Sequence, residues 1–281
     1  MDAPESGDAR NASKVAPITL AFWIMKILAT TLGETAGDFI SMTLGLGYYA
    51  GLAITFSALA IIVYFQISRR YHALLFWTSI VATTTAGTEI SDFMDRSLEL
   101  GYLWGSVVLT AGLLLTLAIW YGRDRNLSVN PILRKDIEIL FWIAVLFSNS
   151  LGTAFGDFLV DDGGLSFIQG ALVTAGVIGL VAALHYLTRV NNVLLFWIAF
   201  VFTRPFGATF GDFLTKPLDL GGLNLPRENA SLITLALLLG VLYVSTRHAQ
   251  QTTANELDDA YSQRSRANRY DSDPSRDPQA R

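Results

Sequence analysis

One pattern occurs four times in this chain and constrains its fold more than any other feature. Each copy begins with Phe-Trp, has a glycine ten residues after the tryptophan and has Asp-Phe starting fifteen residues after it. The landmarks are Trp23, Trp77, Trp142 and Trp197; Gly33, Gly87, Gly152 and Gly207; and Asp38, Asp92, Asp157 and Asp212. Because their spacing has no gap in any copy, the sequence predicts one structural unit used four times.

Each copy lies in a segment long enough to cross a membrane, and a second such segment follows it. The segments with the pattern also carry charge and cover residues 18–41, 72–95, 138–160 and 193–215. The more apolar partners cover 47–67, 101–122, 165–187 and 230–246. A transmembrane helix needs about 20 apolar residues, and the chain has a mean hydropathy of +0.41. We therefore expect an all-α membrane protein with about eight transmembrane helices, built from four two-helix repeats.

The distribution of Lys and Arg among the connections predicts the orientation. One side of the membrane would hold most of these residues, including Arg69, Arg70 and Arg123, whereas the other would hold only Arg96, Lys216 and Arg227. Basic loops stay on the cytoplasmic side. Both termini are therefore expected in the cytoplasm, with all four repeats in parallel orientation and pseudo-symmetric about the membrane normal.

The sequence thus predicts five parts. They are a cytoplasmic N-terminal segment (1–16), a first pair of repeats (17–122), a cytoplasmic linker (123–136), a second pair of repeats (137–247) and a cytoplasmic tail (248–281). The N-terminal segment is acidic, unlike a secretory leader, so we expect the first helix to be retained. The tail is polar and lacks apolar periodicity, which predicts disorder.

Polar residues line one face of each pattern-bearing helix. Residues four and eight positions before each aspartate share its face. The polar ones are Thr30, Glu34, Thr84, Thr88, Asn149, Thr153 and Arg204. Because four polar stripes are untenable against lipid, they are expected to converge on the bundle axis.

Ionisable residues within the membrane are the candidate functional groups, since they are costly there and are usually paired or functional. The candidate cation-binding acids are Glu34, Asp38, Glu89, Asp92, Asp157 and Asp212, with Thr30, Thr84, Thr88, Asn149, Thr153 and Arg204 in support. Arg204 is expected to pair with Glu34 or another axial acid. Lys26 is expected to extend along its helix to the cytoplasmic interface.

Ligands of this kind favour a hard cation. Oxygen ligands without Cys or nearby His suit Mg²⁺, Ca²⁺, Mn²⁺ or a proton. The expected metal ligands are Glu34, Asp38, Asp92, Asp157 and Asp212. The preferred interpretation is a secondary transporter or exporter of such a cation, without enzymatic activity and without a cofactor, since no nucleotide-binding motif occurs. Charge patterning does not indicate nucleic acid binding.

Other interpretations remain open. Asp157 and Asp212, each preceded by glycine, are also suited to capping a turn. The Phe-Trp pairs are expected to anchor helix ends at the interface, and the glycines to permit close packing. A membrane anchor or adaptor that acts through its tail is one alternative function. Another is an enzyme, because Asp92-x-x-Asp95 and Asp157-x-x-x-Asp161 resemble the Mg²⁺-diphosphate sites of polytopic prenyltransferases.

Four runs of sequence resemble a known family. They are LAFWIMKILATTLGETAGDF, VATTTAGTEISDFMDRSL, LFSNSLGTAFGDFL and TRPFGATFGDFLTKPLDLGGL. They are similar to bacterial multi-pass proteins described as uncharacterised membrane-anchored proteins, across residues 14–247. The resemblance implies a location in the bacterial inner membrane. In addition, Glu34-x-x-Gly37-Asp38 is similar to the ExGD signature of manganese and calcium transporters, with one more residue of spacing.

Overall fold

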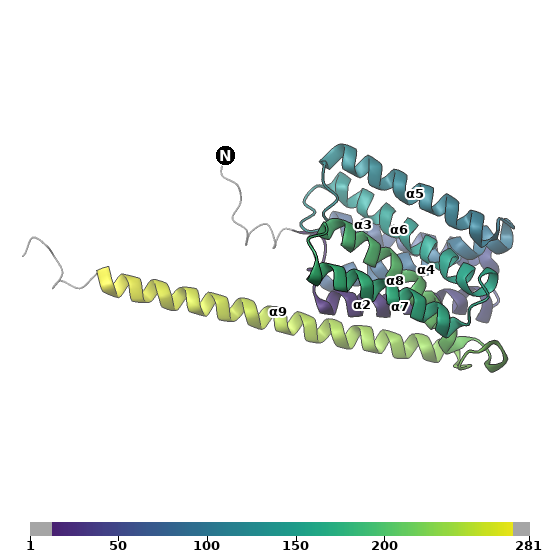
Figure 1. Cartoon of the computed structure of the whole chain (residues 1–281). Helices are drawn as coiled ribbons and strands as arrows, with labels where there is room; N and C mark the ends of the chain where they lie inside the picture. Colours follow the sequence, from purple (N-terminus) through teal and green to yellow (C-terminus); the bar gives the residue numbers. More distant parts are fainter. Residues whose placement is uncertain (1–12, 272–281) are drawn as a thin grey trace, which may run out of the picture.

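Eight α-helices form the described part of the chain, residues 13–271 of a computed structural model (Figure 1). The repeated pattern lies in α2 (Leu20–Asp38), α4 (Ala73–Asp92), α6 (Lys135–Asp157) and α8 (Asn192–Thr215). Each is followed by a second helix: α3 (Gly47–Ser68), α5 (Gly101–Asp124), α7 (Phe167–Leu187) or α9 (Arg227–Asp271). The predicted four two-helix repeats are confirmed. Residues 1–12 and 272–281, at the ends of the predicted terminal segments, lie outside the described residues.

The helices are arranged as two concentric rings. The inner ring consists of α2, α4, α6 and α8, each of which packs against the next, and α8 packs against α2. In the outer ring, α3 packs on α4, α5 on α6, α7 on α8, and α9 on α2. Every outer helix therefore covers the inner helix of the following repeat, and the last repeat covers the first. The result is a closed ring of four repeats.

The two rings differ in polarity. Among the described residues, six helices are long and apolar enough to cross a membrane: α3, α5, α6, α7, α8 and α9. The outer helices leave most of their apolar side chains exposed, for example Leu114 and Leu172, which are each more than half exposed. By contrast, most of α6 and α8 is buried. A multi-pass membrane protein has this distribution, with apolar residues facing lipid and polar ones inside.

The repeated glycine brings neighbouring inner helices into contact. A Cβ on Gly33 would collide with Thr84 of α4, and one on Gly207 would collide with Thr30 of α2. The threonine hydroxyls use this proximity to bond across helices. Thr84 Oγ1 donates to the carbonyl of Ala29 at 3.0 Å, and Thr30 Oγ1 donates to that of Thr203 at 3.1 Å. Small residues that allow close approach are characteristic of membrane helix interfaces, as the sequence predicts here.

The Phe-Trp pairs pack in the core, which differs from the interfacial role predicted for them. Phe22 and Phe76 are at most 1% exposed. Their rings contact the tryptophan of the next repeat, with centroid distances of 5.4 Å for Phe22 to Trp77 and 5.7 Å for Phe76 to Trp142. Because the pairs lie on the inner helices, the outer helices cover them, and they form an aromatic cluster at one end of the bundle. We call this the Trp end of the bundle, and the opposite end the Asp end.

Three inner helices continue past their aspartate as a single π-helical turn. These turns are η1 (Phe39–Thr43), η2 (Phe93–Ser97) and η3 (Phe158–Asp162). In contrast, α8 ends at Thr215, two residues before Pro217, which cannot donate the backbone hydrogen bond that a helix needs. Such turns are frequent at functional sites, and here they form the rim of the Asp end.

The segment before α2 is tied to the Trp end. Val15 and Ala16 are buried. The ammonium of Lys14 donates to the carbonyls of Gln66 and Ile67, at 3.4 and 3.1 Å, and to that of Arg69. It also pairs with the buried carboxylate of Glu138 at 3.6 Å. The predicted N-terminal segment thus includes an ordered part that connects α3 to α6.

The tail that the sequence predicts to be disordered begins with residues that continue α9. α9 continues to Asp271 and projects far beyond the bundle (Figure 1). The first half of α9 packs on α2 and provides the helix nucleus. Extension of an existing helix by one more residue then costs little further free energy. No Gly or Pro occurs between Gly240 and Pro274 to end the helix.

Candidate functional site

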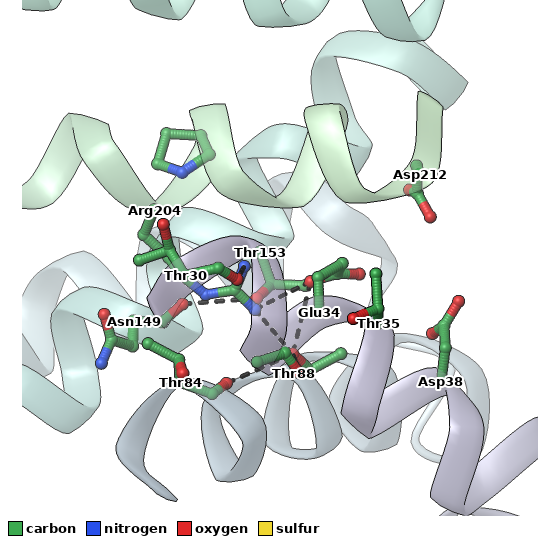
Figure 2. Close-up of polar contacts among 12 residues, drawn as sticks. Thr30, Glu34, Thr35, Asp38, Thr84, Thr88, Asn149, Thr153, Arg204 and Asp212 are labelled. Carbon is green, nitrogen blue, oxygen red and sulfur yellow. Dashed lines mark hydrogen bonds and ion pairs between the residues drawn. The ribbon is translucent and has the colours of Figure 1, made fainter. Parts of the chain in front are cut away.

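An ion pair is buried on the axis of the inner ring. Arg204 of α8 and Glu34 of α2 join through Nη2 and Oε2 at 2.8 Å (Figure 2). Arg204 is 0% exposed and Glu34 is 4% exposed. Arg204 Nη2 also donates to Thr88 Oγ1 at 2.6 Å, and Nη1 donates to the carbonyl of Thr30 at 3.4 Å. The predicted pairing of Arg204 with Glu34 is confirmed.

The repeat explains why an arginine fits at this position. Its equivalents are Thr30, Thr84 and Asn149, seven residues after each tryptophan. Each of these side chains lies against the glycine of the preceding repeat. A Cβ on Gly152 would collide with the Cβ and Cγ of Arg204. Because Gly152 has no side chain, the aliphatic part of Arg204 fits closely against α6. The guanidinium then reaches Glu34 of α2, the inner helix on the other side of α8.

A second buried base lies nearer the Trp end. Lys26 of α2 is 0% exposed and donates to Asn149 Oδ1 at 2.9 Å. Its ammonium also lies 4.2 Å from the centre of the Phe200 ring, a favourable cation–π contact. Asn149 Nδ2 in turn donates to Thr83 Oγ1 at 3.0 Å. The prediction that Lys26 reaches the membrane interface is therefore wrong, because its side chain points into the ring, where Asn149 Oδ1 accepts a hydrogen bond from it.

Basic residues pair with three of the four repeated aspartates at the Asp end. Lys216 Nζ lies 3.2 Å from Asp38 Oδ2 and 3.0 Å from Asp212 Oδ1. Arg227 Nε lies 3.3 Å from the same oxygen of Asp38. Although burial alone would lower it, the carboxylates of Asp212 and Asp38 raise the pKa of the Lys216 ammonium. This lysine is therefore a firmly held internal counter-charge.

The third pair is looser. Arg96 Nε lies 3.7 Å from Asp92 Oδ1, and its guanidinium also donates to the hydroxyl of Tyr48 at 3.0 Å. Both Asp92–Arg96 and Asp212–Lys216 are spaced by four residues, a helical ion-pair spacing that sequence reasoning could have recognised. No local signal in the sequence points to Arg227, because α9 reaches Asp38 only through the closure of the ring.

Two of the predicted acids have no basic partner among the described residues. Asp157 is partly exposed at the Asp end, and none of the ion pairs formed there by described residues includes it. Glu89 is completely buried, and neither of its carboxylate oxygens accepts a hydrogen bond within the described part of the chain. These two carboxyls differ in solvent access: Asp157 borders the rim of the Asp end, whereas Glu89 lies buried between packed helices.

The supporting residues occupy the expected layers. Thr30, Thr84, Thr88, Asn149 and Thr153 are all at most 1% exposed. Thr88 joins the axial ion pair through its hydroxyl, which lies 3.3 Å from Glu34 Oε2. Thr153, one layer from Asn149 on α6, donates to the carbonyl of Asn149 at 3.3 Å. The polar stripes therefore converge on the axis, as predicted.

The predicted metal ligands do not form a metal centre in this conformation. Over residues 13–271, no group of three or more His, Cys, Asp or Glu side chains is placed to hold a metal ion. Protein cations take that place instead: Arg204 at Glu34, Lys216 and Arg227 at Asp38, Arg96 at Asp92, and Lys216 at Asp212. At these four acids, a mobile cation can bind only if the carboxylate exchanges its internal partner for it.

Comparison with known proteins finds one family. The Repeat of Unknown Function (DUF347) matches four times, at residues 21–71, 75–126, 140–191 and 195–251. The matched copies coincide with the four helix pairs of the structure and confirm the resemblance to a family with four repeats. No curated protein and no solved structure matches the chain.

Proposed function

Because the chain belongs to the DUF347 repeat family, whose description gives no activity, we propose a function from the site itself: secondary transport or export of a hard cation across a membrane, without enzymatic catalysis. The cation is Mn²⁺, Mg²⁺, Ca²⁺ or a proton, because the buried ligands offer oxygen only. Transport proceeds by exchange, in which the mobile cation replaces a basic side chain on an axial carboxylate.

The buried pair of Arg204 and Glu34 carries this proposal. Two charges removed from water cost several kcal/mol each, and their attraction recovers this cost only in good geometry. Well-packed apolar side chains would fill the same space without that cost. A charge pair on the axis is therefore better explained by exchange, in which Arg204 is a tethered cation that competes with the transported one. While the pair is closed, the guanidinium also repels free cations along the axis.

The Asp end supports the same mechanism. Lys216 is shared by Asp38 and Asp212, so a cation that enters this end can displace it from one carboxylate while it stays on the other. Asp157 has no basic partner among the described residues and is partly exposed, which makes it the most accessible of the four repeated aspartates for an entering cation. The route then leads from Asp157 at the rim to Glu34 on the axis.

The proposed topology has all eight helices in the bacterial inner membrane. α2 and α4 are less apolar than the other six, and the outer helices α3 and α9 shield them from lipid. The repeats run in parallel, since Gly33 and Gly37 of α2 face Thr84 and Thr88 of α4 in the same order. The excess of Lys and Arg at the Trp end supports cytoplasmic termini.

Flux measurements test the proposal. The full-length protein is reconstituted in liposomes, and Mn²⁺, Mg²⁺, Ca²⁺ and proton fluxes are measured under imposed gradients. One of these fluxes should exceed that of protein-free liposomes and should be lost in Asp157→Asn and in Glu34→Gln. Asp136→Asn is the matched control, because Asp136 is exposed and pairs with Arg134 in the linker at 2.6 Å. Absence of every flux, or full flux in both site variants, contradicts the proposal.

An adaptor is the second candidate, favoured by the length of α9. This helix has 45 residues, and its second half leaves the bundle (Figure 1). Truncation after Thr252 separates the two functions: transport persists without the projecting half, whereas an adaptor loses its partner. A prenyltransferase has less support, because Asp92 is paired with Arg96 and the described residues form no cluster of three acids.

A further inference from the structure

Glu89 is a carboxyl group buried away from the axial ion pair. It lies on α4 twelve residues after Trp77, rotated from the face that carries Thr88 and Asp92. It is 0% exposed, and neither of its carboxylate oxygens has a hydrogen-bond partner within the described residues. Its side chain meets the backbone of α3, since a Cβ on Gly51 would stand 2.6 Å from Glu89 Oε2. The carboxyl is therefore enclosed in the seam between α3 and α4.

The other repeats show that this position does not need an acid for packing. The equivalent residues are Thr35, Ala154 and Thr209. Thr209 meets Gly170 of α7, whose Cβ would lie 3.0 Å from its methyl carbon, just as Glu89 meets Gly51. Thr35 instead accepts a hydrogen bond from Ser231 of α9 at 2.8 Å. In the other three repeats, a small neutral side chain therefore fills the same position between an inner and an outer helix.

Among the residues that the structure describes, none forms an ion pair with Glu89. From α2, the charged groups that act on it are Glu34 and Asp38, which are both acidic. α3 contains no Asp, Glu, Lys, Arg or His, and the acid of α6 in this half of the bundle is Asp157.

The basic and hydroxyl groups of the neighbouring elements are already engaged. Arg96 of η2 pairs with Asp92, and Arg227 of α9 pairs with Asp38. Ser41 of η1, whose hydroxyl is close enough to act on Glu89, donates to the carbonyl of Gly37 at 3.0 Å.

An ionised carboxylate without a partner in an apolar interior is far less stable than the neutral acid, so such a group binds a proton instead. We propose that Glu89 is a proton-binding site in the α3–α4 seam, separate from the axial pair of Arg204 and Glu34. The proton is held while α3 covers the carboxyl at Gly51 and is released when α3 moves away and water reaches it. This site exists whether or not the axial carboxylates carry a cation, so it can be tested without a transport assay.

Reaction with a hydrophobic carbodiimide detects such a group. The reagent reacts with a protonated carboxyl: the acid proton moves to a carbodiimide nitrogen while the carboxyl oxygen bonds to the central carbon. Transfer of the acyl group to nitrogen then gives a stable N-acylurea. The full-length protein in detergent at neutral pH is treated with dicyclohexylcarbodiimide, and peptide masses locate the adduct. We expect the main membrane adduct at Glu89, with labelling that is lost at alkaline pH.

Two variants and a second measurement make the test decisive. The adduct should vanish in Glu89→Gln and persist in Asp162→Asn, which alters an exposed acid at the rim. If Glu89→Gln does not fold, Glu89→Thr copies the residue of two other repeats. The wild-type protein should show the infrared carbonyl stretch of a protonated carboxyl, and this band should be missing from the spectrum of Glu89→Thr. An unlabelled Glu89, or an unchanged carbonyl band in Glu89→Thr, overturns the proposal.

Discussion

The substitution Glu34→Gln tests the axial ion pair most directly. The guanidinium of Arg204 is completely buried, and its acceptors are Glu34 Oε2, Thr88 Oγ1 and the carbonyl of Thr30. Glutamine keeps the shape and one acceptor oxygen but removes the compensating charge. Removal of one partner from a buried ion pair costs about 3–5 kcal/mol. Because two neutral acceptors remain, we expect a value near the lower limit, about 3 kcal/mol of unfolding free energy.

Thermal unfolding measures this cost in purified protein. At roughly 2–4 °C per kcal/mol, the midpoint should fall by about 6–12 °C. The variants Glu34→Gln, Arg204→Met and the double substitution complete a double-mutant cycle, followed by tryptophan fluorescence at constant detergent concentration. The double variant should lose less than the sum of the single variants, because replacement of both charges leaves no uncompensated ion.

Two results would refute this reasoning. The first is a midpoint of Glu34→Gln within the range of Asp136→Asn, whose exposed pair is worth at most about 1 kcal/mol. The second is additivity of the two single substitutions. Either would mean that Arg204 and Glu34 do not depend on each other for stability, although they lie 2.8 Å apart.

Three further predictions concern packing and the ends of the chain. Gly152→Ala should destabilise the protein by about 1–3 kcal/mol, because its methyl group overlaps Arg204. Gly176→Ala, which would meet nothing within 4 Å, should be neutral or stabilising, and equal melting temperatures of the two variants would contradict the ring contact. Lys14→Met should accelerate amide hydrogen exchange at residues 13–16, because it leaves Glu138 without its ion pair; unchanged exchange would show that the segment is held by burial alone. Truncation after Thr252 should change the unfolding free energy by less than about 0.5 kcal/mol, as expected for a segment outside the packing, and a larger loss would mean that the projecting half of α9 contacts the bundle.

The sequence predicts the inner ring well, because its landmarks repeat. A spacing of four residues between Arg204, Ala208 and Asp212 places them on one helical face, and the polarity of that face requires it to point inward. Because all four inner helices carry such a polar face, the four faces are expected to meet on the axis of the bundle. Glu34 could be predicted as a candidate partner of Arg204 for the same reason, since it lies on the equivalent polar stripe of α2.

The features that the sequence does not predict depend on which helices become neighbours. Periodicity shows that α2 has a buried face, but it does not show that α9 covers it or that Arg227 pairs with Asp38. Lys26 has a stem long enough to reach the Trp end or the ring interior, and only the position of Asn149 decides between them. The sequence also does not show how far α9 continues past residue 247, because this polar stretch carries no apolar periodicity.

Closure of the outer ring by the last helix has a consequence for how the protein is made. Among the described helices, α2 leaves the ribosome first, and it is not among the six that are long and apolar enough to cross a membrane. α9, which packs on the outer side of α2, leaves the ribosome last of the described helices. During synthesis, α2 therefore exists before the helix that covers its outer side. Until α9 is present, the polar groups of α2 must be shielded by the insertion machinery or by α4. A chain that stops before residue 227 lacks the helix that packs on the outer side of α2, so the inner ring is fully covered only after α9 has been synthesised.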